Sequence, residues 1–333
     1  MLLESVVLVA ALGIVNAQRP ENVSICDYYT PIAIGENTAE NQQRLMQLIT
    51  HTFILGNYTT PNVGIAVAGI AGPGNFSGHE VNILNYFTGA YYSSNGYDGG
   101  DVGIAKNFLD DGGAEALLAD IPSNTNSSNQ FNLLTHVYQY FGEFYGCSEQ
   151  GKAGFPKYLG VASMYEVHKF MFSDPWESGY FNEQIVLAGR SVGFSEADGD
   201  FTQKALDATF GFRCSPEAAV IPASAGPQLQ AICISDACPL HPNATCSAYP
   251  NDGVAVFPEI ANATLAGSVI KENTTSTDDG ESASASGTAS GTASGTVAPT
   301  AASTNAASAL DLSPTMKVGS VVALLAAGFY ASL

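Results

Sequence analysis

The stretch SNQFNLLTHVYQYFGEFYGC at residues 128–147 decides the fold class of this chain. Large apolar side chains recur in it at intervals of three or four residues: Leu134, Val137, Phe141 and Phe144. That interval places them on one face of an α-helix, because a helix turns once in about 3.6 residues. We therefore expect a helix that packs this face against the core, with Leu133 and His136 beside it.

Helical periodicity extends through much of the chain. Three further segments are predicted to be helices: residues 38–56, 180–193 and 196–213. In the last of them we expect four side chains to face inward: Phe201, Ala205, Ala208 and Phe212. Residues 57–102 are rich in Gly, Asn and Tyr, which predicts an irregular insertion with a strand at 63–70, and a broken helix is expected at 103–120. The predicted fold class is mostly α.

A histidine stands in an apolar helix face in the segment SMYEVHKFMF at residues 163–172. The face is formed by residues at i, i+3, i+4 and i+7: Met164, Val167, His168 and Met171. A buried imidazole needs a polar partner. Two interpretations are open at this point: either His168 bonds a backbone carbonyl in the core, or it ligates a metal or a haem lying against the apolar face.

The segment 128–213 resembles the truncated haemoglobins, a short form of the globin fold. In that family a helix with an aromatic end is followed by a Tyr/Gly loop and a Met-x-x-x-His helix. The corresponding residues here are Phe141 through Gly146, Tyr158-Leu159-Gly160 and Met164-Tyr165-Glu166-Val167-His168. Further along the chain, the family's aromatic-led helix, Gly turn and acid-capped last helix correspond to Phe181, Gly193 and Ser195–Asp198.

The resemblance implies a globin-like helical core with haem as its cofactor. His168 would be the proximal ligand of the haem iron, and the other residues expected to contact haem are Leu133, His136, Val137, Phe141 and Met164. Phe144 is expected to join Phe141 in the wall opposite the His168 helix, and the family's distal Tyr would fall near His51. Handling of O₂ or NO, or haem capture, would be the function. Whether the protein is an enzyme stays open, and no catalytic residue is assigned.

Both ends of the chain carry patterns of processing signals. Residues 5–15 are apolar and precede Val15-Asn16-Ala17, which is typical of a secretory signal peptide cut after Ala17. The apolar tail 318–333 follows a polar spacer and small residues at 303–307, which indicates a GPI-attachment signal with Asn305 as the lipidated residue. A buried N-terminal helix and a C-terminal transmembrane helix are the alternatives.

These patterns predict where the protein is located. A glycolipid anchor would hold it on the extracellular face of the plasma membrane or in a cell wall, with membrane lipid and wall glycan as its partners. Such a combination is typical of a eukaryote with an anchored surface coat, such as a fungus. The chain has 333 residues with 11 Lys+Arg against 31 Asp+Glu, and this acidic balance excludes a nucleic-acid binder.

The six cysteines and the sequons fit an exported protein. In an oxidising compartment we expect three disulfides among Cys26, Cys147, Cys214, Cys233, Cys238 and Cys246, with pairing that the sequence does not decide. A zinc site formed by Cys233, Cys238, His241 and Cys246 is the alternative. N-glycosylation is predicted at Asn22, Asn57, Asn75, Asn126, Asn243, Asn262 and Asn273.

The expected organisation of the chain follows from these segments. It comprises a signal peptide at 1–17, a globin-like helical domain at 18–213 with an insertion at about 57–102, a disulfide-stapled Cys/Pro-rich wrap at 214–272, a disordered Ser/Thr/Ala/Gly stalk at 273–305 and a GPI-attachment propeptide at 306–333. The alternative function is a non-catalytic, glycosylated cell-surface or wall structural protein on a haem-free globin-like scaffold. A third is a surface hydrolase that uses an acid pair, Asp110–Asp111 or Asp198/Asp200.

Overall fold

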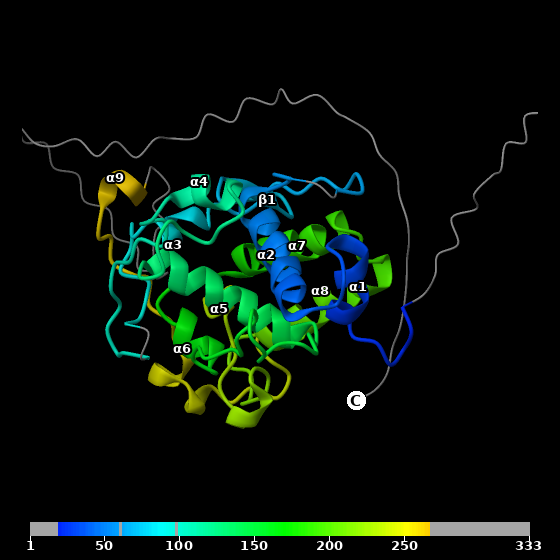
Figure 1. Ribbon diagram of the computed structural model, residues 1–333. Coiled ribbons are helices and arrows are strands. Elements are labelled where there is room, and N and C mark those ends of the chain that lie inside the picture. Colours follow the sequence, from blue (N-terminus) through cyan, green and yellow to red (C-terminus); the bar gives the residue numbers. More distant parts are fainter. Residues whose placement is uncertain (1–18, 60–61, 97–98, 267–333) are drawn as a thin grey trace, which may run out of the picture. The chain divides into compact units, whose positions relative to one another are not determined.

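The computed structural model describes residues 19–59, 62–96 and 99–266. The predicted signal peptide, stalk, propeptide, Asn273 and Asn305 lie outside these residues. The described part is mainly helical, as predicted from the periodicity (Figure 1). Its helices are α1 (Ile25–Ala33), α2 (Ala39–Leu55), α3 (Leu84–Phe87), α4 (Gly113–Leu118), α5 (Asn129–Phe144), α6 (Met164–His168), α7 (Pro175–Ser191), α8 (Glu196–Phe210) and α9 (Ala263–Ala266).

Helix α2 lies at the centre of the helical core. It packs against α1, α5 and α7, and α7 in turn packs against α8 (Figure 1). The side chain of Thr38 caps its start by accepting a hydrogen bond from the Asn41 backbone N–H, and Gly56 ends it with a φ of 87°. The predicted helix over 38–56 is therefore confirmed, and its Leu45 and Phe53 are buried.

Helix α7 begins five residues earlier than the predicted 180. Asp174 and Glu177 form a capping box there, in which each side chain accepts from the other residue's backbone N–H, and Pro175 occupies the first helical position. Proline fits this position because its missing N–H would have no partner inside the helix. Helix α6 is shorter than expected and ends at His168, and four residues later Phe172 has a φ of 53°.

Residues 63–70 do not form the predicted strand. In the predicted helix at 103–120, only α4 is helical. The backbone of residues 63–70 is hydrogen-bonded to helices instead. The N–H groups of Ala68 and Gly69 donate to the side-chain oxygen of Gln184, at 3.1 and 3.0 Å. A two-stranded antiparallel hairpin follows, β1 (Gly74–Phe76) and β2 (His79–Val81), in the register Asn75 opposite Glu80. Alternation of apolar residues predicts a strand only weakly, because hydrogen bonds to distant residues can satisfy the backbone N–H groups instead.

Helix α8 exposes two of the four side chains that were expected to face inward, Phe201 and Ala208, and it ends at Phe210 instead of residue 213. Phe201 is 53% exposed, whereas Asp198 is buried and lies in a polar network. Arg19 Nη2 donates to one Asp198 oxygen at 2.6 Å, and the Tyr29 hydroxyl donates to the other at 2.8 Å. Because this buried carboxylate must face its cation and donor, the helix turns Thr202 and Leu206 toward the core instead.

All six cysteines are paired, so the prediction of three disulfides is confirmed. The pairs are Cys26–Cys147, Cys214–Cys246 and Cys233–Cys238. The zinc alternative is therefore wrong, because its three cysteine ligands are consumed in two different disulfides. The segment after α8 contains short 3₁₀ turns at Ala223–Ala225, Cys246–Ala248 and Pro250–Gly253.

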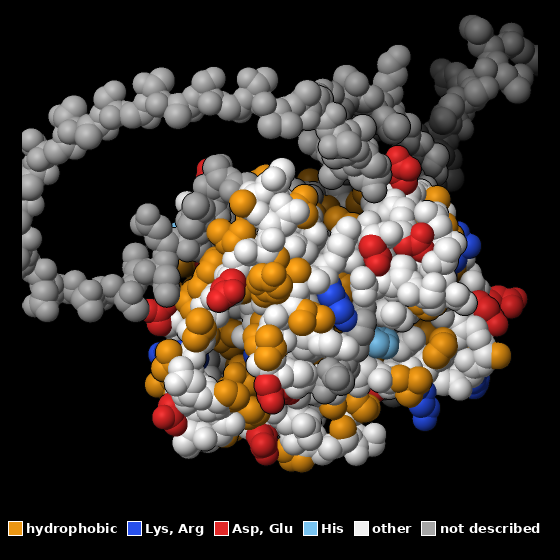
Figure 2. Space-filling view, turned by 90° about the vertical axis from the view of Figure 1, so that its left-hand side faces the viewer, with side chains coloured by type: hydrophobic (Ala, Val, Ile, Leu, Met, Phe, Trp, Pro, Cys, Tyr) orange, Lys and Arg blue, Asp and Glu red, His pale blue; other side chains and the backbone are white. Residues whose placement is uncertain are grey.

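The surface of the described part carries most of the predicted glycosylation sequons. Asparagines of six predicted sequons are exposed there: Asn22, Asn57, Asn75, Asn126, Asn243 and Asn262. Their use as glycosylation sites stays a prediction. Figure 2 shows hydrophobic side chains over much of one face, with acidic side chains between them and few basic ones. Within the described ranges, no helix is long and apolar enough to cross a bilayer.

The disulfides are expected to stabilise the fold to different extents. Cys26–Cys147 joins residues 121 apart, whereas Cys233–Cys238 joins residues 5 apart. In the chain-entropy model, replacing the first pair by alanines costs about 5 kcal/mol of unfolding free energy and replacing the second costs about 2 kcal/mol. Urea denaturation of the two double variants measures both values. Equal losses, or a larger loss for the short loop, would contradict this prediction.

Candidate functional site

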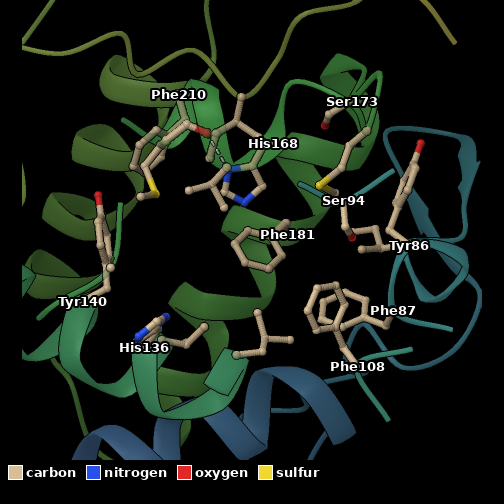
Figure 3. Close-up of a pocket in the computed structure, with 18 of the residues that line it drawn as sticks. Tyr86, Phe87, Ser94, Phe108, His136, Tyr140, His168, Ser173, Phe181 and Phe210 are labelled. Atoms are coloured by element: carbon tan, nitrogen blue, oxygen red, sulfur yellow. Dashed lines mark hydrogen bonds between the residues drawn. The ribbon is translucent and has the colours of Figure 1, made fainter. Parts of the chain in front are cut away.

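A cavity of about 390 Å³ lies between α5, α6, α7 and the segment 83–108. Its lining is mostly apolar, and its size falls in the range of small-molecule sites. All the residues expected to contact haem line it: Leu133, His136, Val137, Phe141, Met164 and His168. The fold thus brings one face of α5 and one face of α6 to the same space (Figure 3).

His168 lies on the cavity wall with a fixed tautomer. Its Nδ1 is 2.7 Å from the backbone carbonyl oxygen of Met164, one turn earlier (Figure 3). Because a carbonyl only accepts, Nδ1 carries the proton and Nε2 keeps its lone pair. Burial lowers the pKa of His168, which favours the neutral ring, and the Met164 hydrogen bond opposes this shift only in part. A neutral imidazole with a free Nε2 is the form that ligates metals.

Helix α6 is held in place from outside. It has only 5 residues, far fewer than the roughly 12 that an isolated helix needs for marginal stability. The buried side chain of Gln230 accepts from the Met164 N–H at 3.4 Å and donates to the Ala162 carbonyl at 3.0 Å. The Leu229 carbonyl accepts from the Ser163 hydroxyl at 2.7 Å. The segment after α8 thereby fixes the helix that carries His168.

The loop before α4 supports α6 from another direction. The Asn95 side-chain N–H₂ donates to the Glu166 carbonyl at 2.7 Å, and Asn95 itself lines the cavity. Its neighbour Ser94 exchanges backbone hydrogen bonds with Ile104, at 3.1 and 2.7 Å. The predicted irregular insertion therefore contributes a wall of the site.

The wall opposite α6 is formed in part by α5. Phe141 lines the cavity as expected, but Phe144 does not line it and instead contacts the rings of Tyr145 and Phe201. The expectation for Phe144 was wrong, because Phe144 is the last residue of α5 and its ring packs beside Phe201 of α8. His136 does face the cavity, and its ring meets that of Tyr158 edge-on at 6.0 Å.

For several of the residues that line the cavity, no local sequence pattern predicts a place in the site. They come from the segment 83–108 and from α8 and the residues after it, and they include Ile83, Phe87, Phe108, Phe210 and Ile232. Among the described lining residues there is no Lys or Arg. The one carboxylate, Glu177, is buried and lies 3.5 Å from the Tyr86 hydroxyl, whose pKa is raised by burial.

His51, near the place where the resemblance puts a distal Tyr, does not line the cavity. It is fully buried, with Nδ1 3.1 Å from the Leu117 carbonyl and Nε2 2.5 Å from the Tyr138 hydroxyl. Nδ1 therefore donates to the carbonyl and Nε2 accepts from the phenol. Both ring nitrogens are used inside the core, so His51 is a structural residue.

The acid pairs of the hydrolase hypothesis have structural contacts. Asp110 accepts from the backbone N–H groups of Asn129 and Gln130 at the start of α5, at 3.1 and 3.0 Å. Asp111 accepts from the Thr125 N–H at 2.6 Å, and Asp198 is paired with Arg19. Asp110, Asp111 and Asp198 thus each have a structural contact, and the hydrolase hypothesis stays a prediction.

Comparison with known proteins gives no match: no family model, no curated protein and no solved structure matches this chain. The site must therefore be interpreted from its own geometry. In the described ranges, no group of three or more His, Cys, Asp or Glu side chains could hold a bare metal ion.

The buried His51 is expected to make the fold sensitive to acid. Burial lowers its pKa from 6.5 to about 4, so the unfolded chain binds a proton at this residue before the folded chain does. The folded state thus loses about 3 kcal/mol of stability at this residue as the pH falls from about 6.5 to about 4. Replacement with His51→Gln removes the titration.

Urea denaturation of the parent and His51→Gln at several pH values tests this expectation. The difference in unfolding free energy between the two proteins should favour the parent most at neutral pH and should shrink by about 3 kcal/mol toward pH 4. A difference that stays constant with pH would show that His51 does not titrate as described.

Proposed function

We propose that this chain is a globin-like haem-binding protein that acts on the outer surface of the cell. His168 would ligate the haem iron through Nε2, and the cavity between α5, α6 and α7 would enclose the macrocycle. The observation that carries the proposal is the hydrogen bond from His168 Nδ1 to the Met164 carbonyl at 2.7 Å, which leaves Nε2 free at an apolar cavity.

The lining suits a metal that brings its own equatorial ligands. A bare ion would need three or four protein ligands, which the described residues do not supply. A metal in a porphyrin needs one or two, and the porphyrin would meet apolar lining side chains such as Met164, Val167 and Phe181. The residues present therefore fit haem better than an isolated metal ion.

The charge of the lining indicates how the cofactor would be held. Without Lys or Arg among the described lining residues, haem carboxylates have no cation to pair with inside the cavity. They would be directed to the rim, where Leu159 is 82% exposed. Binding would then rest on the His168 nitrogen and on apolar contact. When bound, haem supplies a redox-active iron that can take up small ligands; the chain supplies the nitrogen ligand, the apolar walls and the exclusion of water.

The location is part of the proposal and is supported by the sequence. Three disulfides fit an oxidising compartment. The apolar tail 318–333, the Ser/Thr-rich spacer and the small residues around Asn305 support a lipid anchor. The haem-free structural scaffold is the function that would remain if the cavity holds no haem.

Haem binding is expected to depend on His168. Titration of the purified protein with haemin should produce a Soret band that saturates at one haem per chain, and His168→Ala should weaken the affinity at least about tenfold. His79→Ala, in the exposed β2 strand, is the matched control and should bind as the parent does. Circular dichroism checks that both variants are folded.

Two results would contradict haem binding through His168. One is the absence of a Soret band with the folded parent, which would leave the scaffold function. The other is unchanged affinity in His168→Ala, which would assign the iron to a different ligand.

The anchor is expected to be released by a phospholipase. Treatment of intact cells with phosphatidylinositol-specific phospholipase C should transfer the protein to the medium, because the diacylglycerol moiety is cut away. Deletion of 318–333 should lead to direct secretion, and immunoblotting of cells and medium measures both effects. Retention of the truncated chain on cells would contradict a lipid anchor.

A further inference from the structure

A smaller cavity, of about 290 Å³, lies between α7, α8, the β1 strand and the segment that holds the Cys233–Cys238 disulfide. Of its described lining residues, Ser178 and Asn182 also line the cavity that contains His168, and the others do not. Pro175 and Pro239 are among those others, and their rings restrict the backbone of the wall. The protein therefore has another concave site that the proposed haem binding leaves unused.

Three polar side chains of this smaller cavity form a network around one carboxylate. The Asn182 side-chain N–H₂ donates to Asp207 Oδ1 at 2.9 Å, and the Gln203 side-chain N–H₂ lies 2.9 Å from both carboxylate oxygens. Asn182 is buried whereas Asp207 is exposed, so the network extends from the interior of the protein to its surface. Together, the two amides and the carboxylate present both donors and acceptors of hydrogen bonds.

Aromatic rings stand beside these polar groups, because Phe76 and Phe212 line the same cavity. The ring of Phe76 lies directly against the backbone of α7, where residue 179 is glycine. A Cβ at Gly179 would come within 2.3 Å of a carbon of that ring. Glycine weakens the interior of a helix, and here it permits the close approach that brings Phe76 to the cavity wall.

The lining favours a neutral polyhydroxy ligand over other classes of ligand. The described lining residues include no Lys or Arg, and the Asp207 carboxylate would repel an anion. One carboxylate is too few to hold a calcium ion, and an apolar ligand would cover this charge without replacing its hydrogen bonds to water. An ammonium group only donates, so it would leave the amide donors unused.

A sugar ring matches all of these groups. Its hydroxyls donate to a carboxylate and accept from amide N–H groups, and the C–H groups on its faces pack against aromatic rings. We propose that this cavity binds one sugar ring of a glycan, with hydrogen bonds from its hydroxyls to the Asp207 network and with Phe76 and Phe212 as its apolar walls. This site is independent of haem.

Two sources supply a ligand of this chemistry: a polysaccharide of the cell wall and an N-glycan on a neighbouring chain. Calorimetric titration of the purified protein with four probes separates them. The probes are linear hexaoses of β-1,3-linked glucose, of N-acetylglucosamine and of mannose, and the N-glycans released from the protein itself. Trp176, the single tryptophan of the chain, follows the cavity residue Pro175, and its fluorescence gives a second readout.

The parent is expected to bind at least one probe with one site per chain. Asp207→Ala and Phe212→Ala should each weaken this affinity at least about tenfold, because each removes one kind of contact with the sugar. Glu217→Ala is the matched control, since it removes an exposed carboxylate outside the cavity and should bind as the parent does. His168→Ala should also bind the sugar unchanged. Circular dichroism checks folding, and Gln203→Ala replaces any variant that does not fold.

The pattern of binding decides the result. A bound hexaose assigns the site to wall polysaccharide, and binding of the released N-glycans alone assigns it to neighbouring chains; both support the proposal. A folded parent that binds none of the four probes overturns it. Affinity that is unchanged in Asp207→Ala or Phe212→Ala, or that falls equally in Glu217→Ala, also overturns it. None of these outcomes affects haem binding through His168.

Discussion

The site depends on how the protein holds a helix that could not exist alone. Helix α6 presents His168, and its 5 residues are fixed by the Gln230 side chain and the Leu229 carbonyl. Gln230 is buried, and its amide is shared between two parts of the backbone, the Ala162 and Ala218 carbonyls. A misplaced amide would leave several buried polar groups without partners, which is costly. The orientation of the imidazole therefore follows from a residue 62 positions away in sequence, 230 − 168.

This dependence explains why the chain carries disulfides after α8. The segment that contains Gln230 has little regular structure, so its backbone is not fixed by helix or sheet ladders. Cys214–Cys246 and Cys233–Cys238 restrict it on both sides of Gln230. The cross-links thus act on the site indirectly, by limiting the positions open to the residue that holds α6.

Local periodicity was enough to predict the main helices and the cavity face of α5 and α6. It placed α2 within a residue of its ends and grouped Met164, Val167, His168 and Met171, which all line the cavity. It failed where a distant polar group decides the structure. Asp198 turns α8 toward Arg19 and Tyr29, and Gln184 takes the backbone bonds that a strand at 63–70 would have used. The Asp174–Pro175 start of α7 was present in the sequence as a local signal and could have been found.

The Cys26–Cys147 disulfide closes a ring of chain that contains some of the segments that line the cavity and leaves the others outside it. Helix α5 and the loop around Val102, which is 74% exposed, lie inside the closed ring of chain between the two cysteines. A protease that cuts near Val102 would leave both products tied together. The rim residue Leu159 lies between Cys147 and Cys214, a stretch that no disulfide spans. One cut there would leave His136 and His168 on separate polypeptides, joined only by non-covalent contacts.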